Sequence, residues 1–381
     1  MVSAFRLARW SAWLVLGLIL GATSRLEAQK WVDSRYPYIS SGANDFPMLA
    51  VRWVWTRPVE DYFSPYAYMG NLSLDGGISF RGSYFLTALF NAPDLKPGWR
   101  LQAFAGITRE SRFGFFGVGN DTKFDKDLVR DNQPFFYRVR RERQRIQAEV
   151  TRRITGKLHV AGALGLENSK LTQLPGPSVF RSNNPGKLED TDLTTRVSLI
   201  FDARDNEYNT TRGLIVEAGV LRGSAGADYG RIYGEIRGFV PVREGTVIAA
   251  RLAGAGTTGD PPLHARFELP MWERTIAVLG GEDTHRGYDS GRFAGERVLF
   301  GNLEIRHNIL DLATIGAISA IAFVDAGRVF EGEAFRLTTE GLHVGGGGGL
   351  AIRILRSNIF TFNVAKNEEG WNFSMNTGWM F

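Results

Sequence analysis

The segment GGEDTHRGYDSGR, residues 280–292, brings three carboxylates, two arginines, a histidine and a serine together among glycines. Side chains of these types can form a catalytic loop, a solvent-exposed loop, or a plug whose arginine pairs with carboxylates elsewhere in the fold. A guanidinium group such as that of Arg286 presents a rigid fork of N–H donors that suits bidentate pairing with a carboxylate. No regular hydrophobic period runs through the segment, so it is expected to be a loop.

Catalytic chemistry has little support in the rest of the sequence. Asp-Ser-Gly at 289–291 echoes part of a serine-protease signature but lacks its flanking glycines. The chain has no cysteine, which excludes thiol catalysis and cysteine metal sites. No metal-ligand spacing links any pair of the five histidines, which are His159, His264, His285, His307 and His343. We therefore expect no enzymatic activity, no metal and no cofactor.

The elements that would position this loop have the pattern of long strands. Apolar and polar residues alternate over 145–154, 191–204, 230–240 and 300–308, and strict alternation predicts strands with two different faces. A soluble β-sandwich has the same alternation. Strand lengths of roughly ten residues, against a usual five or six, and aromatic residues near strand ends favour a membrane barrel. So do 26 Phe, 11 Tyr and 9 Trp in an exported chain. The predicted fold class is all-β, a single transmembrane antiparallel β-barrel.

Fifteen segments have a strand pattern: 46–57, 66–76, 78–92, 98–110, 133–153, 157–170, 191–204, 210–224, 228–241, 244–257, 295–308, 316–329, 341–355, 357–366 and 371–381. Because single-chain bacterial barrels have an even strand number, we expect sixteen, with one strand missed or merged within 29–130. Fourteen and twelve remain alternatives. The connections should alternate between tight turns at 155–157 and 242–245 and long loops at 111–132, 171–190 and 258–294.

Residues 1–28 have the features of a secretory signal peptide. Two arginines precede an apolar stretch at 10–22, and LEA at 26–28 is a small-residue cleavage site. Cleavage before Arg25 and an uncleaved signal anchor are alternatives, although the apolar stretch is short for a membrane span of ~20 residues. The expected organisation is a signal peptide, 1–28, and one outer-membrane barrel, 29–381, with no separate periplasmic domain.

Five segments resemble the bacterial surface antigen barrels of the BamA/TamA-type outer-membrane insertase and translocase superfamily. In chain order they are FDARDNEYNTTRG (201–213), LPMWERTIAVLGGEDTHRGY (269–288), GNLEIRHNI (301–309), FVDAGRVF (323–330) and FSMNTGWMF (373–381). Residues 269–288 resemble the run into the family's sixth extracellular loop, and residues 373–381 resemble its C-terminal sorting signal. Each segment alone is a weak signal, but the five occur in the family's order and spacing. The similarity covers 191–381 well and 29–190 more loosely.

The resemblance implies that the extracellular loop folds back into the barrel lumen as a plug. Its tip motif would be Arg286, Gly287 and Tyr288, preceded by His285 where the family has valine. The run of five glycines in HVGGGGGLAIR, 343–353, would leave room for the inserted loop, because glycines in a strand often mark a close backbone approach.

The resemblance also implies acidic partners for Arg286 on the inner wall of the barrel. Alternation over 301–309 puts Glu304 on the polar, inward face. Asp325 lies among small and apolar residues, where an unpaired charge would be costly. We therefore expect Arg286, Glu304 and Asp325 to form one charge cluster inside the lumen.

The final strand is expected to carry the sorting signal. Alternation places Trp371, Phe373, Met375, Trp379 and Phe381 on one face of a strand near 371–381. The resemblance implies that Phe373, Trp379 and Phe381 form the signal that directs assembly of the barrel.

Charge and composition limit the possible partners. Loss of 1–28 removes three arginines and one glutamate from the 45 basic and 40 acidic residues, which leaves 42 and 39 and gives no nucleic-acid signal. We interpret the arginine-rich run RVRRERQR, 138–145, as the lumen and outer-rim end of a strand, facing lipopolysaccharide phosphates. The expected partners are outer-membrane lipid and lipopolysaccharide. A separate periplasmic protein is also expected, because the family's insertases carry client-binding POTRA domains for which this chain has no room.

These features predict an integral outer-membrane protein, of Gram-negative type, that assists outer-membrane protein or lipid assembly or transport. A passive porin-like channel is one alternative and predicts an open lumen. A barrel phospholipase is the other, and would need a serine and a histidine on neighbouring strands near the membrane rim.

Overall fold

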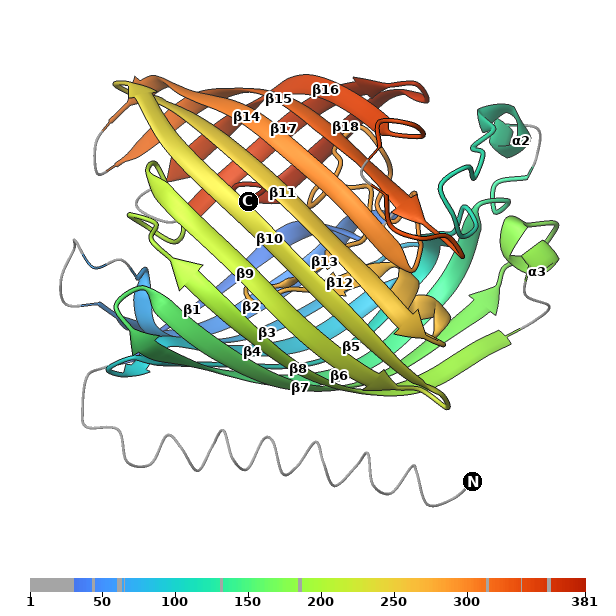
Figure 1. Cartoon of the computed structure of the whole chain (residues 1–381), viewed down its shortest axis with the longest axis horizontal. Coiled ribbons are helices and arrows are strands. Elements are labelled where there is room, and N and C mark those ends of the chain that lie inside the picture. The colour runs from blue at the N-terminus through green and yellow to red at the C-terminus, as the bar shows by residue number, and fades with distance from the viewer. Residues whose placement is uncertain are drawn as a thin grey trace.

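Figure 1 shows the computed structural model of the chain, which describes residues 31–42, 45–59, 64, 66–130, 133–183, 187–312, 315–336, 338–354 and 358–381. The predicted signal peptide, 1–28, lies outside the described residues. Sixteen strands form one antiparallel sheet in the hydrogen-bonded order β1 to β11 and then β14 to β18, while β12 and β13 form a separate hairpin. The predicted all-β fold and the count of sixteen are confirmed.

The first eight strands are β1 (Val32–Gly42), β2 (Asp45–Pro58), β3 (Tyr68–Ser79), β4 (Tyr84–Lys96), β5 (Trp99–Gly114), β6 (Arg138–Thr155), β7 (Leu158–Gln173) and β8 (Lys187–Asp202). The other strands of the sheet are β9 (Gly213–Ser224), β10 (Asp228–Arg243), β11 (Thr246–Gly259), β14 (Arg297–Asp311), β15 (Gly316–Phe330), β16 (His343–Ile354), β17 (Asn358–Asn367) and β18 (Gly370–Thr377). The remaining elements are β12 (Glu268–Pro270), β13 (Thr275–Ala277), α2 (Lys126–Arg130), α3 (Val179–Asn183) and the 3-10 helix η2 (Leu263–Arg266).

The strand that alternation did not find is β1, which lies within the expected range 29–130. Pro37 interrupts its pattern, and proline lacks the N–H that a ladder needs. Val32 and Asp33, on successive positions, are both exposed, so neither face of β1 has the buried character that produces alternation.

Within the strands, charged residues face the interior and apolar residues face outward. On β10, Arg231 and Glu235 are each 5% exposed, whereas Ile232 is 70% exposed. This distribution is the reverse of that in a soluble protein. It is what a barrel with a polar interior and lipid around it requires.

The two ends of the barrel, where the strands are connected, differ as predicted. The tight turns between β6 and β7 and between β10 and β11 lie at one end of the barrel. The long connections lie at the other end; they are 115–137, 174–186 and 260–296. Because the strand number is even, β1 begins and β18 ends at the end of the barrel that has the tight turns. Outer-membrane barrels keep short turns in the periplasm and long loops outside. The long loops and their helices α2 and α3, at the right in Figure 1, therefore mark the extracellular end.

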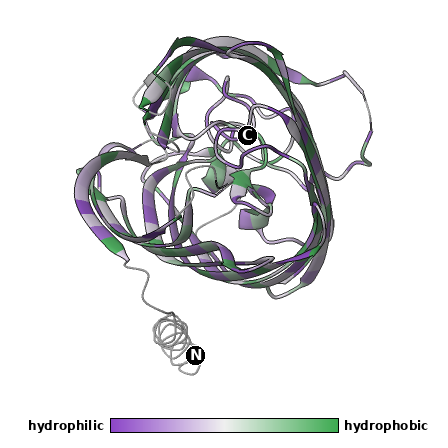
Figure 2. Ribbon diagram, turned by 90° about the vertical axis from the view of Figure 1, so that its left-hand side faces the viewer, coloured by the Kyte–Doolittle hydropathy of each residue, from purple (hydrophilic) through white to green (hydrophobic). Residues whose placement is uncertain are grey.

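The connection 260–296, which we call the plug, folds back into the lumen: Figure 1 shows its strands β12 and β13 among the strands of the barrel, and Figure 2 shows chain segments enclosed by the curved sheet. An apolar cluster fills the space between the plug and the inner wall. Its plug members are Leu269, Met271, Ile276, Val278, Leu279, Tyr288 and Phe293, and its wall members are Tyr233, Ala253, Ala255, Val298, Phe300 and Val329. The hydrophobic core of this protein therefore lies inside the barrel.

A second apolar cluster closes the extracellular end. The ring of Phe115, from the loop after β5, lies 5.3 Å from that of Phe180 on α3 and 5.8 Å from that of Phe267 in the plug. The start of the plug is thereby fixed beneath two extracellular loops. Among the described residues, no helix has the length and apolar character needed to cross a membrane.

Candidate functional site: the lumen plug

The structure brings Arg286, Glu304 and Asp325 together inside the lumen. The Arg286 guanidinium donates from Nε to Asp325 Oδ2 at 2.9 Å and from Nη2 to Oδ1 at 2.8 Å. Its third nitrogen, Nη1, donates to Glu304 Oε1, and the backbone N–H of Arg286 donates to Asp325 Oδ2 at 3.0 Å. The planar fork of arginine is thus fully used, as bidentate carboxylate recognition requires. We call these three residues the clamp.

Neighbouring side chains neutralise the clamp and complete its hydrogen bonds. Arg306 Nε donates to the second oxygen of Glu304 at 2.7 Å. Asn302 Nδ2 donates to Asp325 Oδ1 at 2.8 Å and to the carbonyl oxygen of Thr284 in the plug at 2.9 Å. Two arginines therefore balance two carboxylates. Such satisfaction is needed because Arg286 is 1% exposed and Asp325 is 0% exposed, and a buried unpaired charge is unstable.

The strands determine which side chains can reach Arg286. Asn302 on β14 lies opposite Asp325 on β15, and Glu304 lies opposite Phe323 in the same ladder. Residues two apart on a strand share a face, so all four point inward. The Phe323 ring lies beneath the guanidinium, with Arg286 Cζ 3.5 Å from the ring centroid.

Burial and neighbouring charges shift the pKa values of Arg286 and His285 in opposite directions. Burial opposes ionisation of Arg286, but the neighbouring Glu304 and Asp325 carboxylates raise its pKa above the usual value. Burial lowers the pKa of His285. His285 Nε2 lies 3.2 Å from the His343 carbonyl oxygen, which can only accept, so this nitrogen carries the proton.

The other residues of the predicted tip motif face the C-terminal strands. Tyr288 donates its hydroxyl to Glu368 at 3.0 Å. Asn367 Nδ2 donates to the carbonyl oxygen of Gly287 at 2.6 Å, and Asn372 of β18 donates to that of Arg286 at 2.9 Å. The tip is therefore bound on one side by β14 and β15 and on the other by the end of β17 and by β18.

The glycine run of β16 makes room for the tip at one position. A Cβ atom added at Gly345 would lie 2.7 Å from Cε1 of His285, so only glycine fits beneath that ring. At Gly347 the nearest atoms belong instead to the backbone of β17. The glycine run therefore makes room for the loop at Gly345, where the His285 ring closely approaches the backbone of β16.

A second anchor lies at the far tip of the β12–β13 hairpin, toward the periplasmic end. Trp272 donates its backbone N–H to Glu217 at 3.0 Å and its indole N–H to Thr151 at 2.9 Å. Glu273 accepts from Arg204 at 2.8 Å and from Arg237 at 2.7 Å. Sequence reasoning missed this anchor. Alternation could place Glu217 and Arg237 on the inner face, but it could not place the hairpin against them.

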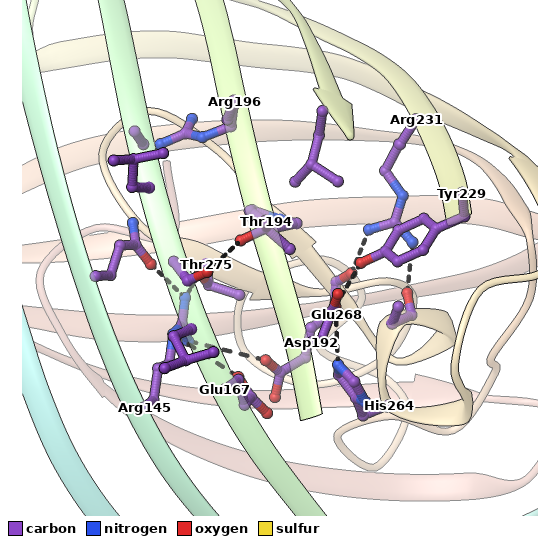
Figure 3. Close-up of a pocket in the computed structure, with 18 residues that line it drawn as sticks. Arg145, Glu167, Asp192, Thr194, Arg196, Tyr229, Arg231, His264, Glu268 and Thr275 are labelled. Carbon is purple, nitrogen blue, oxygen red and sulfur yellow. Dashed lines mark hydrogen bonds and ion pairs between the residues drawn. The ribbon is translucent and has the colours of Figure 1, made fainter. Parts of the chain in front are cut away.

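A third anchor joins the plug to β6 through Glu268 of β12. Arg141 Nη1 donates to Glu268 at 3.1 Å, and Arg143 also donates to it. Figure 3 shows the cavity beside this anchor, of about 60 Å³, with Arg145 and Glu268 on opposite sides of the plug–wall boundary. Arg231 of β10 crosses this boundary and donates to the Glu268 carbonyl oxygen at 2.8 Å. The arginine-rich run 138–145 therefore does face the lumen at alternate positions.

The C-terminal residues depart from the single face that alternation assigned to them. Phe373 lies on β18 and is exposed outward. The strand ends at Thr377, and Gly378 adopts φ 96°. The chain then turns inward, so that Phe381 is buried against Phe239 in the lumen, and Arg306 donates to its main-chain oxygen at 3.0 Å. The predicted strand to 381, with Phe381 on the same face as Phe373, is therefore wrong. The glycine provides the left-handed turn, and two lumen arginines, Arg251 and Arg306, lie against the Phe381 ring.

Both carboxylates of the clamp are engaged by arginines, Glu304 by Arg286 and Arg306 and Asp325 by Arg286. Within the described part of the chain, no group of three or more histidine, cysteine, aspartate or glutamate residues could hold a metal ion.

Comparison with known proteins identifies the relatives of this fold. The chain is similar to BamA from Haemophilus ducreyi lacking POTRA domains 1–3, at 14% identity and a TM-score of 0.56, over 92% of this chain and 70% of that one. It is also similar to CdiB from Escherichia coli, at 12% identity and a TM-score of 0.56, over 93% of this chain and 62% of that one. CdiB from Acinetobacter baumannii matches at 14% identity and a TM-score of 0.51, over 92% and 59%. This chain thus spans about three fifths of the CdiB chains. No curated protein matches by sequence.

The sequence itself also matches a family model. Residues 61–378 match the Omp85 superfamily domain, which is most of the 381-residue chain and includes the plug and both of its acidic wall partners. Together with the sixteen-stranded sheet, this confirms the resemblance that five short segments indicated. Membership of this superfamily agrees with the outer-membrane location expected from the sequence. The chain belongs to the Omp85 superfamily.

Proposed function

We propose that this barrel assists the assembly or transport of proteins or lipids of the outer membrane, and that it does so without an enzymatic step. The observation that carries the proposal is the buried clamp. A plug held by neutralised ion pairs is a defined closed state, which differs from a passive pore and from an unfilled scaffold.

The filled lumen argues against the passive porin. A porin needs a continuous aqueous channel, whereas here apolar residues from the plug and the wall pack together in the lumen. Between wall and plug, the cavity lined by Arg145 and Glu268 measures about 60 Å³ and the cavity lined by Arg100 and Trp272 about 150 Å³. The steady conductance expected of a porin is therefore not expected of this barrel.

The two end strands support a role in assembly. The hydrogen-bonded order runs from β1 to β18, and no ladder joins these two strands within the residues that the structure describes. An unpaired strand edge presents backbone donors and acceptors on which another strand can form. The pairing of β18 is also short, since it ends at Thr377, where the chain turns into the lumen. We propose that these two edges receive client strands, with the surrounding lipid and a separate periplasmic protein as partners.

Reconstitution tests the proposal. The purified barrel is placed in liposomes, an unfolded small outer-membrane protein is added, and its folding is followed by heat-modifiable migration on gels. We expect faster folding than in empty liposomes and in liposomes that hold a porin of similar size. Equal rates in all three would contradict the proposal. A large steady conductance would then support the porin, and calcium-dependent lipid cleavage would support the phospholipase.

A further inference from the structure

The arginine-rich strand β6 also carries charges on its outer face. Arg141 and Arg143 point inward and bind Glu268 of the plug. The residue between them, Glu142, points the other way and forms ion pairs with Arg109 of β5 at 3.7 Å and with Lys170 of β7 at 3.6 Å. These contacts join three neighbouring strands across the outside of the barrel. The run 138–145 therefore forms ion pairs on both the inner and the outer face of the sheet.

The outer charges lie just above the apolar belt. Arg109, Glu142 and Lys170 occupy one row of the ladder, in which each lies opposite the next. Four positions toward the periplasm along β6 and β7, the outward residues are Ile146 and Leu166, which also lie opposite each other. At ~3.4 Å per residue and a strand tilt of roughly 40°, the charged row stands about 10 Å above this apolar row. The outward residues between the two rows, Gln144 and Asn168, are polar, so the apolar belt ends at Ile146 and Leu166 and the charged row lies at headgroup level.

Cations outnumber carboxylates in this patch. Arg140 lies two residues before Glu142 on the same face of β6, and with Arg109 and Lys170 it gives three cations. The nearby carboxylates are Glu142 and, opposite Lys170 in the next ladder, Glu189. Among the described residues, Arg140 forms no ion pair with a carboxylate, and Arg109 Nε lies 3.7 Å from Glu142, beyond hydrogen-bonding distance.

At two other places on the rim, the cations are matched by carboxylates. At the extracellular ends of β14 and β15, Arg297 pairs with Glu296 and Arg328 pairs with Glu333. Near the turn between β9 and β10, Arg222 pairs with Asp228 at 2.7 Å. Excess positive charge above the belt thus distinguishes β5 to β7 from these places.

We propose that Arg109, Arg140 and Lys170 form a binding site for the phosphate groups of lipopolysaccharide in the outer leaflet. Guanidinium groups bind phosphate oxygens with two parallel N–H bonds, and an ammonium group supplies a further point charge. Apolar residues directly below the charges fit the acyl chains of the same lipid molecule. The site faces away from the plug, and its lipid contact does not depend on the assembly role.

The test compares two triple variants of equal charge change in nanodiscs. The first is Arg109→Ala with Arg140→Ala and Lys170→Ala; the control is Arg222→Ala with Arg243→Ala and Arg336→Ala, at exposed cations elsewhere. Binding of lipopolysaccharide is titrated after heat-modifiable migration has shown that each barrel is folded. Each cation near an anionic lipid surface contributes roughly fivefold to binding, so the first variant should bind roughly a hundredfold more weakly and the control should bind as the wild type does.

A second variant should change lipopolysaccharide binding in the opposite direction. Glu142→Gln removes a carboxylate from the patch and should strengthen lipopolysaccharide binding roughly fivefold. Equal binding by both triple variants would overturn the proposal. It would also fail if dephosphorylated lipopolysaccharide or phosphatidylglycerol bound the wild type as tightly as intact lipopolysaccharide, because the site would then not read the phosphates of this glycolipid.

Discussion

Replacing Arg286 by alanine tests whether the clamp holds the plug. The change removes the bonds from Nε, Nη1 and Nη2, while the backbone N–H bond to Asp325 can persist. Glu304 keeps Arg306 as its counter-charge. Asp325, which is 0% exposed, keeps only neutral donors and becomes an uncompensated buried charge. The loss of stability therefore comes mainly from the unpaired charge on Asp325.

The size of the effect follows from this burial. Breaking a buried pair by removing one partner costs about 3–5 kcal/mol. That cost would raise the population with a released plug by a factor of roughly 150 to 5,000. Asp325→Ala should have a similar effect, because it leaves Arg286 with Glu304 alone and adds a net positive charge to a dry site. In the double variant both charges are absent, so its cost should fall short of the sum of the single costs by ~0.5–3 kcal/mol.

Limited proteolysis within 280–294 of the folded barrel measures the release. A docked tip is shielded, since Arg286 and Tyr288 are each 1% exposed, and a released tip can be cleaved. The control is Arg222→Ala, which breaks an ion pair on the surface and should change stability by less than about 1 kcal/mol. If Arg286→Ala is as resistant as the wild type, or if the two single costs add fully in the double variant, the clamp does not hold the plug.

Four further outcomes are expected. Trp272→Ala should cost about 3–5 kcal/mol and expose the hairpin at 270–275 to protease, because it removes a buried aromatic ring together with its indole hydrogen bond. Gly345→Ala should cost about 1–3 kcal/mol, measured as a lower temperature of heat-modifiable unfolding, because its Cβ would meet His285; Gly162→Ala, whose Cβ would meet nothing within 4 Å, is the control. Phe381→Ala should slow barrel assembly in cells and also destabilise the assembled barrel, since the ring is buried in the lumen; an unchanged melting temperature would contradict the second effect. The chain made in a Gram-negative bacterium should fractionate with the outer membrane after loss of residues 1–28, and recovery in the soluble periplasm would contradict this.

The barrel could be predicted from local alternation, and the clamp from alternation together with the family resemblance. A period of two identifies strands and fixes which side chains point inward, so Glu304 could be assigned to the lumen from its immediate neighbours. The resemblance then supplied the loop that meets it. Alternation does not say how high in the lumen a loop docks. The contacts of Trp272 with Glu217 and Thr151 therefore could not be inferred, although both partners lie on strands whose inward faces were apparent.

The inward turn at Gly378 shows where a continuous pattern misleads. Trp379 and Phe381 continue the aromatic alternation of β18, and only the left-handed conformation of the glycine between them and Thr377 breaks the register. What stabilises the turn lies far away in sequence. Arg306 donates from Nε to Glu304 and from Nη2 to the Phe381 main-chain oxygen, so one guanidinium contacts both the clamp and the C-terminal segment. Because β18 is an end strand of the sheet, displacement of the C-terminal segment at that edge would also remove an acceptor from the arginine that neutralises the clamp. Arg306 thereby links the C-terminal segment to the clamp, in addition to the direct bonds to the plug made by Asn372 of β18 and by Met380 with Arg274.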